Sequence, residues 1–192
     1  KNQGTLDKYI GDAVMCFFNA PLHVENHSFL ACKTALEQKQ KLQELNKAWK
    51  LHYKGIDEDI SIRIWIHTGE AIHGNIGSVL SRVNYTIIWD SVNLASRLES
   101  VSKKYGIAIC VSDEVYQREK DSFCFRKIDT QVLLKWKKTP TDLYELVCSK
   151  DEEITEDLQE MYHNYSLWLE AYEKFDYKTA SKYFLKNPKD IT

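Results

Sequence analysis

The sequence has few glycines and prolines and no long apolar run. It contains 7 glycines and 3 prolines in 192 residues, and its glycine share is below the ~7% that is average for globular proteins. The longest apolar run, residues 13–18, is far shorter than the ~20 residues that span a bilayer, and the chain does not open with a signal peptide. We therefore expect a soluble chain that is long enough to bury a core.

An excess of one charge is also lacking. The 26 basic and 28 acidic residues give a formal net charge of −2, so the charge balance does not predict a polyanionic partner, and we expect no nucleic acid ligand. The five cysteines are scattered without a CxxC pair, a pattern typical of reduced thiols inside a cell and not of structural zinc or disulfides. We therefore expect a cytoplasmic location for this part of the protein, whether or not a membrane anchor lies upstream.

The apolar periodicity predicts a mixed α/β sandwich. Residues 26–53 carry a helical stripe, whereas residues 60–66 alternate between isoleucine and other residues as in a half-buried strand, with 71–76 expected to return beside it. Asp90 can cap a helix that runs to Tyr105, and Gly106 stands where a helix-ending glycine is expected. Further predicted elements are a strand at 107–111, a short helix from Ser112, and strands at 123–128, 131–136 and 142–147.

The composition changes near residue 151. Charged and aromatic residues follow at helical spacing, and a turn near Asp176 would fold a second helix back on the first, similar to a single tetratricopeptide-type hairpin. The alternative is a helical tail that docks on its own domain or on a partner segment. The predicted division is a domain at 1–148 and a helical tail at 151–192.

Two segments carry polar residues in patterns that suggest chemistry. Residues 6–15 read as two strands around a Gly-Asp turn, which places Asp12 at an exposed hairpin tip. A carboxylate there can hold a metal, although Gly-Asp is also simply a good turn. Residues 84–99 read as a strand that runs into a helix, on which Asn93 and Arg97 share one face. An amide beside a guanidinium suits a phosphate.

These segments, together with Arg-Ile-Trp-Ile-His-Thr-Gly-Glu at 63–70, Gly-Asn-Ile-Gly at 74–77 and Leu-Lys-Trp-Lys at 134–137, resemble the catalytic domain of class III nucleotidyl cyclases. The resemblance spans about residues 4–147 and is to adenylate cyclases of bacterial type, which convert ATP to cyclic AMP and pyrophosphate. It implies an α/β (α+β) fold with a ferredoxin-like mixed sheet, here followed by a C-terminal helical hairpin.

The resemblance implies a two-metal site. In the family two Mg²⁺ or Mn²⁺ ions are held by two aspartates, and Asp12 matches the second of them. The strand that bears the first aspartate precedes the part of the family pattern with which this sequence begins. We therefore expect an N-terminally truncated domain, which would not cyclise ATP by itself, and a sensor domain upstream in the full-length protein.

The remaining site residues are also implied by the resemblance. Lys8 matches the lysine that reads the purine, and Thr86 matches the second base-reading position. Asn93 matches the residue that orients the ribose, and Arg97 the one that stabilises charge on the α-phosphate. Triphosphate contacts are expected at Lys135, with Lys137 as a substitute and Arg82 as a weaker candidate. The family does not use His67, Glu70 and His73 for catalysis, so we interpret them as structural.

Family active sites lie between two domains, one presenting the metal aspartates and the other the base, ribose and phosphate residues. This chain holds residues of both kinds. A head-to-tail homodimer with shared sites is therefore predicted.

Three tryptophans depart from the family pattern. Trp65, Trp89 and Trp136 stand where the motifs have glycine, and an indole in place of a hydrogen would cost ~1 to 3 kcal/mol or more in a packed site. Our hypothesis is that the source organism reads UGA as glycine, and UGG codons at these positions would reject it. With genuine tryptophans, the alternative is a catalytically silent, cyclase-like nucleotide-binding or dimerisation module. A purely structural α/β domain with a helical protein-binding tail is a third alternative.

Overall fold

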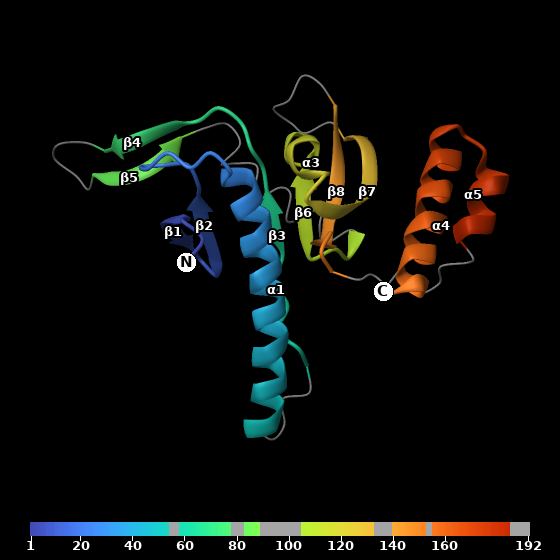
Figure 1. The fold of residues 1–192 in the computed structure, drawn as a ribbon, viewed down its shortest axis with the longest axis horizontal. Coiled ribbons are helices and arrows are strands. Elements are labelled where there is room, and N and C mark those ends of the chain that lie inside the picture. Colours follow the sequence, from blue (N-terminus) through green and yellow to red (C-terminus); the bar gives the residue numbers. More distant parts are fainter. Residues whose placement is uncertain (54–57, 78–82, 89–104, 133–139, 153–154, 185–192) are drawn as a thin grey trace.

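The computed structural model describes residues 1–53, 58–77, 83–88, 105–132, 140–152 and 155–184 (Figure 1). The elements are β1 (Thr5–Ile10), β2 (Ala13–Phe17), α1 (His27–His52), β3 (Ile64–Ile66), β4 (Ile72–Ile76), β5 (Asn84–Ile88), β6 (Ile109–Ser112), α3 (Asp113–Glu119), β7 (Phe123–Val132), β8 (Thr141–Ser149), α4 (Glu156–Glu173) and α5 (Tyr177–Phe184). Within these ranges no helix combines the length and the apolar character that a membrane crossing requires.

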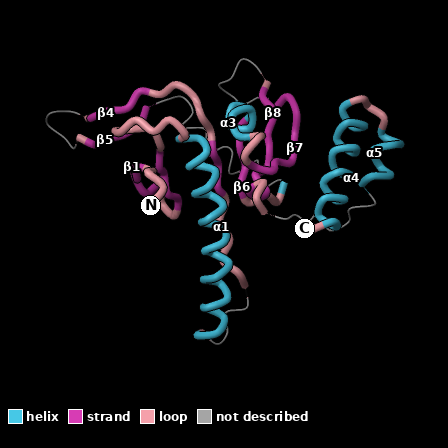
Figure 2. The backbone as a smooth tube through the Cα atoms, in the orientation of Figure 1, coloured by secondary structure: helices cyan, strands magenta, loops and turns pink. Residues whose placement is uncertain are grey.

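A four-stranded mixed sheet forms the centre of the fold. Its strand order is β3-β6-β8-β7, with β3 parallel to β6 and the other pairs antiparallel. Helices α1 and α3 pack on the sheet (Figure 2), and the core between them includes Cys32 of α1, Val111 of β6, Val115 of α3 and Leu146 of β8, all fully buried. The predicted α+β fold with a mixed sheet is confirmed.

Two short ribbons lie beside this sheet. Strands β1 and β2 form an antiparallel hairpin, and β4 and β5 form a second antiparallel pair; β1 contacts β5. The prediction that residues 71–76 return beside 60–66 is wrong, because β4 pairs with β5 whereas β3 pairs with β6. Hydrophobic alternation identified each strand but could not identify its neighbour, since partner choice depends on contacts distant in sequence.

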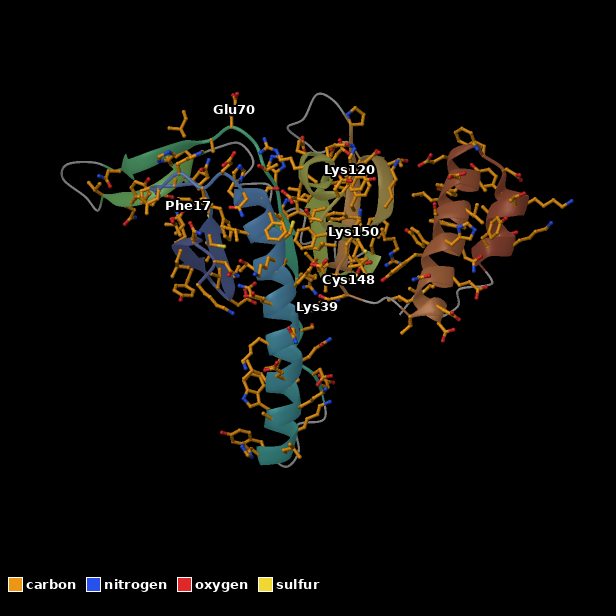
Figure 3. The ribbon with its side chains drawn as sticks, viewed as in Figure 1. Phe17, Lys39, Glu70, Lys120, Cys148 and Lys150 are labelled. Atoms are coloured by element: carbon orange, nitrogen blue, oxygen red, sulfur yellow. The ribbon has the colours of Figure 1, made fainter. Side chains whose placement is uncertain are left out.

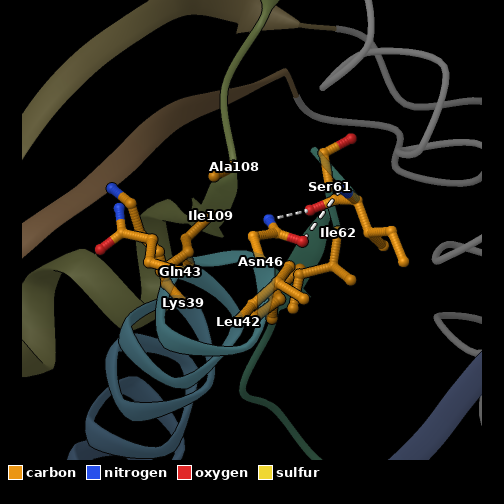
Figure 4. Close-up of a pocket in the computed structure, with 10 residues that line it drawn as sticks. Lys39, Leu42, Gln43, Asn46, Ser61, Ile62, Ala108 and Ile109 are labelled. Carbon is orange, nitrogen blue, oxygen red and sulfur yellow. Dashed lines mark hydrogen bonds between the residues drawn. The ribbon is translucent and has the colours of Figure 1, made fainter. Parts of the chain in front are cut away.

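The strand predicted over 60–66 is also shorter than expected, because β3 begins only at Ile64. The Asn46 side chain of α1 accepts a hydrogen bond from the Ile60 backbone N–H at 3.2 Å and donates one to the Ile60 carbonyl at 2.8 Å. These two bonds satisfy backbone groups that a sheet ladder would otherwise use. They form one wall of a small pocket of about 150 Å³ between α1 and the chain leading into β3 (Figure 4).

The C-terminal helices α4 and α5 form a hairpin that contacts β7 through α4. The turn between them contains Phe175 in the left-handed region, with φ 59°, and the Asp176 carboxylate accepts a hydrogen bond from the Thr179 backbone N–H at 3.1 Å. The Tyr165 hydroxyl of α4 donates to the Ile128 carbonyl of β7 at 3.0 Å, and the Arg126 guanidinium lies 4.7 Å from the centre of the Tyr165 ring. These contacts attach the hairpin to the edge of the sheet.

Replacing Tyr165 with phenylalanine should lower the free energy of unfolding by about 1 kcal/mol, because the Ile128 carbonyl loses its hydrogen-bond donor. Urea unfolding of this chain measures the change. Tyr177→Phe is the matched control, since Tyr177 is 59% exposed. Equal unfolding free energies for Tyr165→Phe and the unchanged chain would show that this contact does not attach the helices.

Trp65 is the only one of the three unexpected tryptophans that lies within the described residues. It pairs with Cys110 across β3 and β6 and, like Tyr105, packs against an apolar cluster that contains Ile107 and Cys110. Its buried indole Nε1 has no hydrogen-bond partner among the described residues. An orphaned indole N–H costs free energy, which is consistent with an indole that does not belong at this position.

Candidate active site

The β1–β2 hairpin carries Lys8 on one strand and Asp12 at its tip. Gly11 adopts φ +63° at the turn, a left-handed conformation that glycine takes without a steric penalty. Leu6 pairs with Cys16 and Lys8 with Met15. Asp7 therefore has no partner in this ladder and is the extra residue of a β-bulge. A bulge can turn two consecutive side chains toward the same neighbour, whereas regular strand geometry sends them to opposite faces.

Lys8, Thr86 and Asp7 form a hydrogen-bonded cluster. The Lys8 ammonium donates to the Thr86 hydroxyl at 2.9 Å, and the Thr86 hydroxyl donates to Asp7 Oδ2 at 2.6 Å. Lys8 Nζ also lies 3.4 Å from Asp7 Oδ1, and the Asp7 side chain is only 1% exposed whereas that of Lys8 is 44% exposed. The two residues predicted to read the base therefore meet, although 78 positions separate them.

Thr86 is only 7% exposed, but the cross-strand position beside it leaves room. Thr86 lies opposite Gly74 in the β4–β5 pair, and a Cβ placed on Gly74 would meet no atom of the described residues within 4 Å. Glycine in a strand often marks a place where a ligand or another backbone comes close. The Phe17 ring of β2, labelled in Figure 3, lies 6.2 Å from that of Tyr85 and joins the two ribbons.

Asp12 occupies the predicted position at the exposed turn between β1 and β2. A carboxylate is a suitable ligand for Mg²⁺ or Mn²⁺, and the exposed turn leaves it accessible to an ion. No group of three histidine, cysteine, aspartate or glutamate side chains within the described ranges could hold a metal ion. Asp12 would therefore be one ligand of a site completed by other groups.

The predicted catalytic residues Asn93 and Arg97 lie outside the described residues, as do Lys135 and the weaker candidates Lys137 and Arg82. Trp89 and Trp136 lie outside them as well. Their roles stay predictions.

The three residues interpreted as structural have different surroundings. His67 Nδ1 lies 2.9 Å from the Ser112 hydroxyl, and His73 Nδ1 lies 2.8 Å from the Tyr85 hydroxyl on the neighbouring strand. Glu70 points outward from the segment before β4 (Figure 3). They do not gather into one site.

Asp7 is the site residue that the sequence did not reveal. Strict alternation places residues 7 and 8 on opposite faces of a strand, so Asp7 would be expected to face away from Lys8 and its partner. The bulge brings both side chains to Thr86. An acidic residue directly before the lysine is the only signal, and it is weak without the bulge.

Residues 6–163 match the profile of the adenylate and guanylate cyclase catalytic domain. The chain belongs to this family. The cyclase domain is 36% identical over 146 residues to adenylate cyclase 1 of Rhizobium meliloti, covering 76% of this chain and 21% of that protein. It is 34% identical over 147 residues to adenylate cyclase of Anabaena cylindrica, covering 74% of this chain and 28% of that protein. It thus spans between a fifth and a third of these relatives.

The fold agrees with that of solved cyclases. The crystal structure of the adenylyl cyclase CyaB from P. aeruginosa superposes with a TM-score of 0.67 and 34% sequence identity, covering 82% of this chain and 76% of that one. The fold and the family implied by the sequence motifs are therefore confirmed.

Proposed function

We propose that this domain belongs to an adenylate cyclase that converts ATP to 3′,5′-cyclic AMP and pyrophosphate. The observation that supports the proposal most strongly is the contact between Lys8 and Thr86. We further propose residues 1–148 as the catalytic domain and 151–192 as a helical tail, and a cytoplasmic location, where ATP is available.

The chemistry of the Lys8–Thr86 pair favours adenine over guanine. Adenine presents a hydrogen-bond acceptor at N1 and an amino donor at position 6, whereas guanine presents an N1–H donor and a carbonyl acceptor. The Lys8 ammonium only donates, and a hydroxyl whose proton is already engaged accepts. Adenine therefore satisfies both groups and guanine neither.

The reaction joins the ribose 3′-oxygen to the α-phosphorus while the bond to pyrophosphate breaks, and the hydroxyl proton leaves to a base. Asn93 holds the ribose so that its hydroxyl attacks in line, and Arg97 stabilises the negative charge that grows on the α-phosphate. Lys135 contacts the triphosphate. Asp12 would provide one of the two aspartates that hold two Mg²⁺ or Mn²⁺ ions, whose charge would activate the hydroxyl and neutralise the phosphates.

The active site is shared between two copies of the chain in this proposal. One copy presents Asp12 and the other presents Lys8, Thr86, Asn93 and Arg97, under control of a sensor domain elsewhere in the protein. Large apolar side chains of the hairpin are exposed, with 71% for Tyr9, 55% for Ile10 and 60% for Val14. Adjacent exposed apolar groups are typical of an interaction surface, which supports association through this region.

A second candidate function applies if Trp65 is genuine. Its indole Nε1 has no hydrogen-bond partner among the described residues, and if tryptophan is genuine at this position the lost hydrogen bond is a permanent free-energy cost. A domain that tolerates it would be a catalytically silent module that binds nucleotide or mediates dimerisation.

Incubation of the full-length protein with ATP and Mg²⁺ or Mn²⁺ tests the proposal, with cyclic AMP and pyrophosphate measured together. We expect equal amounts of both products, and little cyclic GMP from GTP. Nucleotide binding without either product would favour the silent module. Cyclic GMP as the main product would contradict the assignment to ATP.

A further inference from the structure

The buried carboxylate of Asp7 has no role in the reaction described above, yet it contacts both base-reading side chains. Its side chain is 1% exposed, lies 3.4 Å from the Lys8 ammonium and accepts a hydrogen bond from the Thr86 hydroxyl at 2.6 Å. The β-bulge that places it there interrupts the β1–β2 ladder between Leu6 and Lys8. A carboxylate removed from water in this way requires such partners to offset its lost hydration.

Asp7 determines the direction in which the Thr86 hydroxyl bonds. A threonine hydroxyl has one proton to donate and two lone pairs that accept. The hydroxyl donates a hydrogen bond to Asp7 Oδ2, and one of its lone pairs accepts a hydrogen bond from Lys8. What is left for a ligand is the second lone pair, so the hydroxyl can accept from a ligand but cannot donate to it.

The same count applies to Lys8. Its ammonium has three N–H groups, of which one donates to Thr86, and Asp7 Oδ1 lies near enough, at 3.4 Å from Nζ, to attract a second. A third remains for a ring nitrogen that accepts. The cluster therefore offers one donor next to one acceptor, in the polarity that adenine requires.

We propose that Asp7 is a positioning residue for base selectivity: it fixes the Thr86 hydroxyl as an acceptor and thereby excludes purines that carry an oxygen at position 6. The inference rests on the proposed function and deepens it. Without an acceptor at Asp7, the Thr86 hydroxyl can rotate and donate to the 6-oxygen of guanine. One of the two contacts that discriminate against guanine is then lost.

Asp7→Asn is the sharpest test, because it keeps the shape and changes the hydrogen-bond polarity. The ammonium of Lys8 attracts the amide oxygen, which turns the amide N–H₂ group toward Thr86. Thr86 then accepts from residue 7, and its own proton becomes available to a ligand. We expect the ratio of kcat/KM for ATP to kcat/KM for GTP to fall about tenfold or more in the full-length protein.

Asp142→Asn is the matched control, since Asp142 also pairs with a lysine, Lys127, at 2.8 Å but lies on β8. It should leave the ratio unchanged. A merely structural role of Asp7 would lower kcat/KM for both nucleotides by the same factor, and that result, or an unchanged ratio in a folded Asp7→Asn variant, would overturn the inference.

Two further measurements keep the test decisive. For the unaltered protein, kcat/KM for inosine triphosphate should lie within about threefold of kcat/KM for GTP, because both nucleotides carry the 6-oxygen and the N1 proton. If inosine triphosphate is used as readily as ATP, the inference is overturned, even if Asp7→Asn does not fold. Calorimetric binding of ATP and GTP separates the two proposals. If the protein forms no cyclic AMP, the proposed function fails, whereas a preference for binding ATP that Asp7→Asn removes would still support the role of Asp7.

Discussion

Replacing Arg97 with alanine should lower cyclic AMP formation by the full-length protein about 100- to 1000-fold, which is typical for the loss of one group that stabilises transition-state charge. The guanidinium can donate two parallel hydrogen bonds to phosphate oxygens, and no other side chain type replaces that geometry. Because the charge on the α-phosphate grows as the reaction proceeds, the loss should appear in kcat more than in KM.

Steady-state kinetics with ATP measures the effect of Arg97→Ala. Arg118→Ala is the control, since Arg118 is an exposed residue of α3 with no assigned part in the reaction, and its kcat should match that of the unaltered protein. Normal cyclic AMP output from Arg97→Ala would remove the main catalytic assignment.

Replacing Lys8 with methionine should lower kcat/KM for ATP by about 10- to 100-fold, the range expected for losing a hydrogen bond from a charged donor. Methionine keeps much of the length and apolar surface of the lysine stem but has no N–H group for adenine N1 or for the Thr86 hydroxyl, which Lys8 contacts at 2.9 Å. Discrimination against GTP should weaken at the same time, because the donor that conflicts with the guanine N1 proton is gone.

Lys120→Met is the matched control for this change, because Lys120 lies at the exposed end of α3, where its ammonium donates to Gln117 at 3.2 Å. Urea unfolding of Lys8→Met shows whether the protein remains folded without the ion partner of Asp7. If folded Lys8→Met turns over ATP as fast as the unaltered protein, Lys8 does not read the base.

The long local patterns predicted most of the fold. Hydrophobic spacing located α1, whose buried Cys32 and Ala35 face the sheet, and the Gly-Asp turn located the β1–β2 hairpin within a residue or two. Gly106 has the positive φ of 65° that its position after the predicted helix implied. Each of these features depends on neighbours in the sequence, and such local preferences are readable from the sequence alone.

Pairings between distant segments could not be predicted in the same way. Whether β4 lies beside β3 or β5 depends on which contacts bury more surface, and the isoleucine pattern of 60–66 suits a longer strand equally well. The side chain of Asn46, which bonds with both backbone groups of Ile60, accounts for one end of that strand. A polar residue in the middle of a helix does not indicate such a role in advance.

The candidate site shows the same limit in one residue. The resemblance to cyclases indicated Lys8 and Thr86, and the structure brings them together. Asp7 was missed because a one-residue bulge reverses the direction that strand alternation assigns to a side chain. Bulges change the register without leaving a strong compositional signal.

In the proposed dimer two copies of this chain form one active site, and mixing two inactive variants tests this arrangement most directly. Asp12→Ala should remove the metal ligand from one side of the site and Arg97→Ala the phosphate ligand from the other. When both variants of the full-length protein are co-expressed in equal amounts, about half of the dimers contain one of each, and each such dimer has one intact site of two, so about a quarter of the normal cyclic AMP formation should return. Activity of the mixture no higher than that of the two variants measured separately, with mixed dimers demonstrably present, would contradict the shared site.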